Sequence, residues 1–172
     1  IESAARERQL LNALNCCHRH GLTEVHDMAT DDEDAKTLFK LDREQQLPIK
    51  VVLYLKDNSK IFEQSDLFTY NHHQRHYRPK CRVGGIKLFL DGSFGSSTAA
   101  LIEPYQGDPN NFGILNDKHY LVSTIAEAYR LKLPVAIHAI GDRAVRSAVK
   151  MLSSTPPVKN SPPHRIEHAQ MI

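Results

Sequence analysis

The sequence predicts an α/β fold in which a parallel β-sheet is covered by helices on its outer side. Apolar segments of four to eight residues alternate with longer segments whose apolar residues recur at helical spacing. Strands and helices that alternate in this way are typical of parallel sheets, because each helix carries the chain back to start the next strand. The 172 residues, of which 41% are hydrophobic and 24% charged, have the composition of an ordinary globular domain.

The first half of the chain predicts two helices and two strands. Residues 2–19 place leucines at helical spacing and end before Gly21, which stands where a C-terminal cap would. A short strand follows over 22–28, and the acidic run after it has the charge of a helix N-terminus. The apolar run at 48–55, introduced by a proline, predicts a buried parallel strand.

The second half is irregular at first and then regular. Residues 56–82 include a possible helix without a clean period. A strand is predicted behind two glycines in GGIKLFLDGS, and a long polar segment follows it to about Asp117, a length that usually indicates function. After this segment the sequence predicts a helix at 118–131, a strand at 133–139, a helix at 142–152 with Asp142 as its N-cap, and a strand at 164–169.

Charge and hydropathy exclude some classes of partner. The net charge is +2 and the basic residues are scattered, so neither nucleic acid nor an anionic membrane surface is expected as a partner. No apolar run approaches the roughly 20 residues of a membrane-spanning helix. The cysteines are Cys16, Cys17 and Cys81, an odd number with two adjacent, which favours reduced thiols and a cytoplasmic location.

Three predicted strands carry reactive side chains near their carboxyl ends, where the active sites of parallel sheets gather. Lys87 and Asp91 share one face of their strand, away from the apolar face that can pack under helices. His138 and His168 lie near the ends of the next two strands. Two imidazoles at neighbouring strand ends can converge on one metal ion.

Each of these residues also has a structural interpretation. Lys87 could pair with Asp91, and each histidine could be a core residue satisfied by the backbone. Asp142 and Arg143 could be a helix cap and an ion-pair partner for Glu167 rather than substrate ligands.

Other polar clusters carry weaker signals. The segments CCHRH at 16–20 and HHQRHY at 72–77 contain metal-binding residue types, but a helix end and a solvated basic surface are the better interpretations. His26 and Asp27 end a predicted strand, and a simple turn is favoured there.

Four motifs together resemble the amidohydrolase superfamily, in the branch called amidohydrolase family three, which includes N-substituted formamide deformylase. The motifs are GLTEVHDM, then IKLFLDGSFGSSTAALIEPY with GDPNNFGIL after it, then VAIHAIGDRAV, and HRIEHAQ. They cover most of residues 21–172 and occur in the order of the family.

The resemblance implies a TIM-like (β/α)8 barrel, of which this chain would supply about five parallel strands, the second to the sixth. It also implies one or two divalent metal ions, usually zinc, at the strand ends. Lys87 matches the fourth-strand lysine that can be carboxylated, and His138 and His168 match the fifth-strand and sixth-strand ligands. The expected activity is hydrolysis of a small-molecule amide-type carbon to nitrogen bond, other than a peptide bond, by metal-activated water.

The resemblance also suggests which residues contact the substrate. The segment SFGSSTAA lacks the lysine of a phosphate loop and the glycines of a nucleophile elbow, and it matches the active-site loop of the family. The substrate-binding residues expected from these motifs are Asp91, Ser93, Ser96, Ser97, Asp142 and Arg143.

The chain also departs from the family pattern. It lacks the first-strand His-x-His pair and the eighth-strand Asp, and 172 residues fall short of the roughly 250 of a full barrel. Residues 1–172 are therefore expected to be one partial catalytic domain of a longer protein, inactive alone, with open sheet edges that could pair with another copy. The alternative is a catalytically inactive barrel that acts as a binding or regulatory protein.

Overall fold

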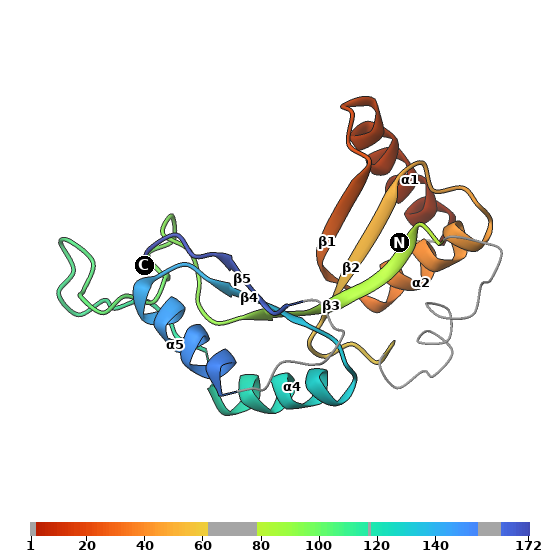
Figure 1. The fold of residues 1–172 in the computed structure, drawn as a ribbon. Helices are drawn as coiled ribbons and strands as arrows, with labels where there is room; N and C mark the ends of the chain where they lie inside the picture. Colours follow the sequence, from red (N-terminus) through yellow and green to blue (C-terminus); the bar gives the residue numbers. More distant parts are fainter. Residues whose placement is uncertain (1–2, 62–78, 117, 155–162) are drawn as a thin grey trace. The chain divides into compact units, whose positions relative to one another are not determined.

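The computed structural model describes residues 3–61, 79–116, 118–154 and 163–172 (Figure 1). The elements are α1 (Ser3–Arg19), β1 (Glu24–Thr30), α2 (Asp32–Arg43), β2 (Lys50–Lys56), β3 (Cys81–Phe89), α4 (Lys118–Arg130), β4 (Val135–Ala139), α5 (Asp142–Ser153) and β5 (Arg165–His168). The chain divides into two compact units, residues 1–84 and 85–172, and β3 runs from the first into the second. The prediction of a single domain over 1–172 stays a prediction.

The first unit places two helices against two parallel strands. β1 pairs with β2 in parallel, with Val25 opposite Val51, and β2 is buried along all but its end residues. The α1 helix ends where the sequence predicts, because Gly21 takes the left-handed conformation (φ 84°) that allows a helix to stop. The core of this unit includes Leu14, Leu38, Phe39, Leu41, Leu47, Ile49, Leu53, Leu55 and Ile61.

The second unit places two helices on the outer face of three strands. The parallel pairings set Phe89 of β3 opposite His138 of β4, and His138 opposite Glu167 of β5. In Figure 1 the helices α4 and α5 lie on the same side of these strands. The residues buried between the helices and the strands include Ile86, Leu88, Leu90, Leu121, Ile125, Val135, Ile137, Ala144, Ala148 and Met151.

The strand order β1-β2-β3-β4-β5 confirms the predicted fold class. Five strands in sequence order, with α2, α4 and α5 in the connections β1–β2, β3–β4 and β4–β5, make up part of a TIM-like barrel. β1 and β5 are the two ends of this order. None of the described helices is both long and apolar enough to cross a membrane.

Several predicted element boundaries are shifted, β1 among them (24–30 rather than 22–28), and two of the wrong boundaries have a clear physical cause. β3 begins at Cys81 rather than behind the glycine pair, because the backbone is already engaged there: Val51 N–H donates to the Lys80 carbonyl (2.7 Å). α5 begins at Asp142, but its N-cap is Gly141, which gives no side-chain cap. The Asp142 carboxylate instead accepts the N–H of Ile102. The irregular helix predicted within 56–82 lies mostly outside the described residues.

The N-terminus of α2 gives a stability test. Asp31 Oδ1 accepts the N–H groups of Glu33 (3.1 Å) and Asp34 (2.9 Å), and these bonds hold the pKa of Asp31 below its usual value. We expect Asp31→Ala to lower the free energy of unfolding by about 1 kcal/mol at neutral pH, measured by chemical denaturation.

A lowered carboxylate pKa contributes stability above its unfolded value and loses that contribution as pH falls through the folded value. The difference between Asp31→Ala and the unsubstituted protein should therefore shrink in acid. Asp31→Asn, which keeps an accepting oxygen, is the matched control and should cost only a few tenths of a kcal/mol. A loss from Asp31→Asn as large as that from Asp31→Ala would contradict this account of the cap.

Candidate metal site and its supporting loop

Lys87 is a buried lysine in the middle of the second unit. Its residue is 4% exposed, and its Nζ lies 4.5 Å from the centre of the Phe89 ring and 3.4 Å from the Leu88 carbonyl oxygen. Burial lowers the pKa of Lys87 to about 8, partly offset by the negative charge of Glu167. The expected alternative, a pair with Asp91, does not form among the described residues, and burial gives Lys87 a larger share of neutral amine than an exposed lysine has.

His138 lies on β4 with one ring nitrogen already engaged. Its Nε2 is 2.9 Å from the Gly92 carbonyl oxygen and 3.5 Å from Asp91 Oδ1. Both oxygens can only accept from an imidazole, so Nε2 must carry the proton and donate it. The lone pair of the ring is therefore on Nδ1, which is the nitrogen that can bind a metal ion in this arrangement.

His168 lies at the end of β5 and meets His138. The two ring centroids are 4.6 Å apart and the planes cross at 72°, edge to face. The strand register sets Glu167, rather than His168, opposite His138. His168 has a left-handed backbone (φ 73°), which breaks the regular alternation of side chains at this residue. Burial, His138 and Lys87 together lower the pKa of His168, which favours the neutral imidazole that metal binding requires.

Asp91 follows β3 and is fully enclosed by backbone. Its Oδ1 accepts the N–H of Ile140 (3.0 Å), and its Oδ2 accepts those of Ala100 (3.0 Å) and Gly141 (2.8 Å). Three amide donors compensate the charge that burial would otherwise make costly. The carboxylate thus joins the end of β3, the long loop after it and the turn between β4 and α5.

Asp142 and Arg143, at the start of α5, form further hydrogen bonds to the long loop that follows β3. Asp142 Oδ1 accepts the N–H of Ile102 (2.9 Å), and the Arg143 guanidinium donates to the Phe112 carbonyl oxygen (3.0 Å). The Arg143 N–H also donates to the Ala100 carbonyl (3.1 Å). The ion pair suggested between Arg143 and Glu167 is not formed, because Glu167 pairs with Arg165 (2.7 Å).

The predicted serine loop forms a chain of hydroxyl groups. Ser93 Oγ lies 3.0 Å from Ser96 Oγ, which lies 2.6 Å from Thr98 Oγ1. Ser97 is exposed and has a left-handed backbone (φ 54°). Because all three serines are exposed, their hydroxyl groups are available to a ligand, and the predicted substrate role for them stays a prediction.

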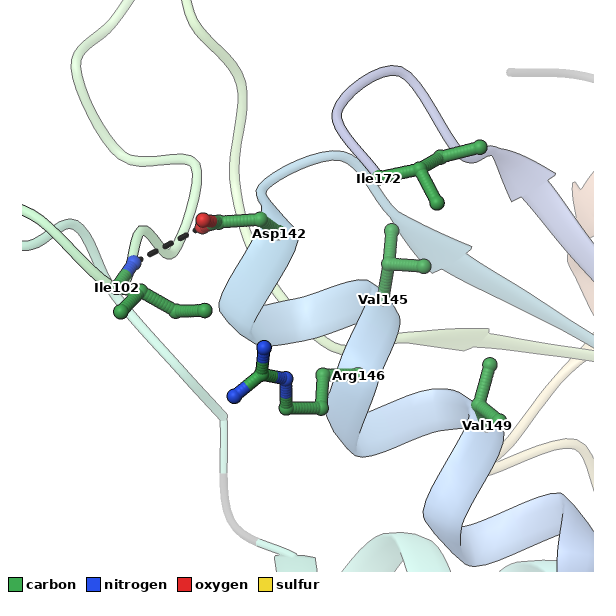
Figure 2. A pocket seen from close by; sticks show the side chains of 6 residues that line it. All are labelled: Ile102, Asp142, Val145, Arg146, Val149 and Ile172. Atoms are coloured by element: carbon green, nitrogen blue, oxygen red, sulfur yellow. Dashed lines mark hydrogen bonds between the residues drawn. The ribbon is translucent and has the colours of Figure 1, made fainter.

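A pocket of about 390 Å³ lies against α5 (Figure 2). It is lined by Ile102, Asp142, Val145, Arg146, Val149 and Ile172. The figure shows the Asp142 carboxylate turned to the backbone of Ile102 at one end of the pocket. None of the three predicted metal ligands lines it, so this pocket is separate from the strand-end site.

The remaining clusters have local partners. His20 Nδ1 lies 2.9 Å from the Cys16 carbonyl oxygen, and His26 lies beside Glu24 (3.3 Å). The turn predicted at His26 and Asp27 is wrong, because both residues lie inside β1, opposite Val52 and Leu53 of β2. Asp27 accepts the Thr30 hydroxyl (2.9 Å). The segment at 72–77 lies outside the described residues. In the part of the chain that the structure describes, no three His, Cys, Asp or Glu side chains gather as a metal site; the predicted set contains only two residues of these types.

Sequence reasoning missed several groups that build the site. The Gly92 carbonyl that fixes the His138 proton is backbone, so no residue type signals it. Thr98 completes the hydroxyl chain, and Asn116 donates to the Phe89 carbonyl oxygen (2.8 Å). Thr98 lies within the SFGSSTAA segment and could have been included with the serines.

A β/α sheet that gathers a buried lysine and two imidazoles near its strand ends defines a class of metal-dependent barrel hydrolases. The donor set fits a divalent metal, because both imidazoles can offer a lone pair and burial lowers the pKa of Lys87, which makes its neutral amine more accessible than that of an exposed lysine. The chain belongs to the amidohydrolase family, whose model matches residues 2–172.

Relatives of known sequence and structure agree with this assignment. The chain is 39% identical over 95 residues to YtcJ of Bacillus subtilis (strain 168), a match that covers 55% of this chain and 18% of YtcJ. It resembles the solved structure of an uncharacterized metal-dependent hydrolase from Pyrococcus horikoshii OT3 (TM-score 0.83, 31% identity, 98% of this chain and 33% of the other). A second such hydrolase, from Pyrococcus furiosus, gives a TM-score of 0.76 at 33% identity over 89% and 32% of the two chains. The chain thus spans about a third of the hydrolases it matches.

The contact between α5 and the loop gives a further stability test. A Cβ at Gly141 would run into the backbone of Ala100, which cannot move without breaking its bonds to Asp91 and Arg143. We expect Gly141→Ala to destabilise the protein by about 1–3 kcal/mol, measured by denaturation. Gly95→Ala, in the same loop with open space around the new Cβ, is the control and should change stability by less than about 0.5 kcal/mol. Equal effects of the two variants would contradict the close approach at Gly141.

Proposed function

We propose that the full-length protein is a metal-dependent hydrolase that cleaves an amide-type carbon to nitrogen bond other than a peptide bond. The observation that carries the proposal is the meeting of His138 and His168, 4.6 Å between ring centroids, near the buried Lys87 in a member of the amidohydrolase family. The solved relatives are metal-dependent hydrolases, which supports the same reaction class. The remaining ligands would come from outside these 172 residues.

Lys87, His138 and His168 are the proposed ligands for one or two divalent ions, with zinc favoured because imidazole nitrogen suits it. His138 would offer Nδ1, since its Nε2 donates to Gly92. When bound, such an ion lowers the pKa of water and polarises the substrate carbonyl.

Lys87 is proposed to act as a carbamate. Its ammonium form has no lone pair, but the neutral amine can attack carbon dioxide, forming a carbon to nitrogen bond and releasing one proton. The product carries two anionic oxygens that can bind metal. Burial of Lys87 supports this role, because it favours the neutral amine that reacts.

The loop side chains are proposed to orient the substrate. The exposed hydroxyls of Ser93, Ser96 and Ser97 could donate to a carbonyl or accept from an amide N–H. Asp142 and Arg143, which hold the loop through Ile102 and Phe112, are proposed to act with them.

Loss of a ligand should remove both metal and turnover. We expect His138→Ala and His168→Ala in the full-length protein to lower metal content, measured by elemental mass spectrometry after dialysis, and to abolish hydrolysis of N-substituted amides. His20→Ala, at an exposed histidine whose ring contacts Cys16 far from the strand ends, is the control. Full activity in His168→Ala would refute the assignment, and an unsubstituted protein without metal would favour the inactive binding or regulatory alternative.

Lys87 allows a sharper test of the carbamate. Lys87→Ala should lose activity, and short carboxylic acids added to the solution should restore part of it by replacing the missing anionic oxygens. Lys87→Arg keeps a positive charge but cannot form the carbamate, so it should be inactive without added carbon dioxide and with it. Turnover by Lys87→Arg at the unsubstituted rate would rule out the carbamate and leave the histidine assignment standing.

We also propose a cytoplasmic location, supported by three free thiols at Cys16, Cys17 and Cys81. The proposed ligand is a small amide-type molecule, with neither nucleic acid nor membrane as a partner. A homo-oligomer through the strands at the ends of the sheet order stays a proposal.

A further inference from the structure

We propose that Asp91 is a positioning residue for His138: it holds the imidazole in the tautomer that carries its proton on Nε2, through backbone groups and its own charge. The tautomer itself is a property of the protein without metal or substrate. Its consequence for metal binding rests on the proposed function.

The Asp91 carboxylate follows β3 and contacts groups at the end of β4. Asp91 Oδ1 accepts the Ile140 N–H (3.0 Å) and lies 3.5 Å from His138 Nε2. Ile140 is two residues beyond His138, so the same oxygen fixes the backbone after the histidine and faces its ring. Displacement of the Asp91 carboxylate would therefore disturb both the backbone at Ile140 and the surroundings of the His138 ring.

The Gly92 carbonyl is the second group that faces the His138 ring. Gly92 directly follows Asp91, and its carbonyl oxygen is the close acceptor of His138 Nε2 (2.9 Å). The Gly92 N–H donates to the Thr98 carbonyl (3.2 Å), and a Cβ at residue 92 would collide with the Thr98 side chain. The carbonyl is therefore held between the fixed Asp91 carboxylate on one side and the loop on the other.

The negative charge of Asp91 also affects which nitrogen of His138 carries the proton. With a carbonyl and a carboxylate oxygen both near Nε2, an imidazole with its proton on Nδ1 would place a nitrogen lone pair against two oxygen lone pairs. The alternative tautomer is penalised by this repulsion. Asp91 supplies the charged part of the penalty.

The enclosure of Asp91 argues against the substrate-binding role expected from the sequence. Its side chain is 0% exposed, and both oxygens already accept backbone N–H groups. A substrate could reach the carboxylate only by displacing these donors. Asp91 is better placed to act through His138 than on the substrate.

The test uses full-length protein purified without metal and labelled with ¹⁵N at histidine, because a bound metal would fix the tautomer by itself. Two-bond ¹H–¹⁵N spectra distinguish an imidazole protonated at Nε2 from one protonated at Nδ1. His138→Gln assigns the signal. We expect the unsubstituted protein to show His138 with its proton on Nε2 alone.

Asp91→Asn is the test variant, since it keeps the size of the side chain but leaves one accepting oxygen for three backbone N–H groups. It should populate the Nδ1-protonated form of His138. Asp142→Asn is the matched control: its carboxylate also accepts backbone N–H groups, from Ile102 of the loop and from Arg143 of α5, and none of its contacts in the described residues involves His138. Asp142→Asn should leave the His138 signal unchanged, which separates positioning from a general loss of loop structure.

An unchanged His138 tautomer in folded Asp91→Asn would overturn the proposal. If Asp91→Asn does not fold, the unsubstituted protein decides: an Nδ1-protonated His138, or rapid hydrogen exchange at the amides of Ala100, Ile140 and Gly141, would equally overturn it. Slow exchange at those three amides with a single Nε2-protonated form would support it.

A separate zinc titration addresses the consequence for the site. Asp91→Asn should weaken zinc binding by about 10–100-fold, the usual effect of removing a residue that orients a metal ligand. If the unsubstituted protein binds no zinc, the proposed function fails while the tautomer result stands. If zinc binding is intact in Asp91→Asn although the tautomer shifts, the proposed function stands and the positioning has no effect on affinity.

Discussion

A carboxylate removed from water is stable only when other groups compensate its charge, and Asp91 meets this requirement entirely with backbone N–H groups. Its donors belong to the loop after β3 and to the turn between β4 and α5. If one of these segments moved away, the buried carboxylate would lose a hydrogen bond that compensates its charge, so the segments are held together. The positions of the Gly92 carbonyl, of the His138 ring and of the first turn of α5 all follow from this one constraint.

The site also holds two groups in states that cost stability. Lys87 is buried away from a close counter-ion, and the left-handed backbone of His168 is uncommon for a residue with a side chain. The backbone of His168 brings its ring against that of His138. Costs of this kind concentrate at functional sites because the surrounding structure supports them.

The long segment between β3 and α4 is also held in place by polar groups. It has little regular structure of its own. Hydrogen bonds within the loop and bonds to Asp91, Asp142 and Arg143 hold it. The glycine at 141 lets it approach the start of α5 closely. A loop fixed in this way can present the hydroxyls of Ser93 and Ser96 at a constant place beside the strand ends.

The elements of the fold could be predicted from the sequence because periodicity reports burial directly. The alternation in IKLFLDGS separates Lys87 from its apolar neighbours, and the structure buries those neighbours under helices. The boundaries of the elements were harder to predict from the sequence than the elements themselves. The N-cap of α5 is Gly141 rather than Asp142, whose carboxylate accepts the N–H of Ile102, forty positions away in the chain. Local propensity contains no information about such a partner.

By itself, the sequence determined the α/β class, the strands that carry Lys87, His138 and His168, and the family to which the motifs belong. The tertiary structure decided what surrounds them. The donors to Asp91 lie 9, 49 and 50 positions away, and the acceptor of the His138 proton lies 46 positions away. All four are backbone groups, which almost every residue carries. Because backbone groups look alike in any sequence, only folding could show which of them meet, and therefore which nitrogen of His138 is left free.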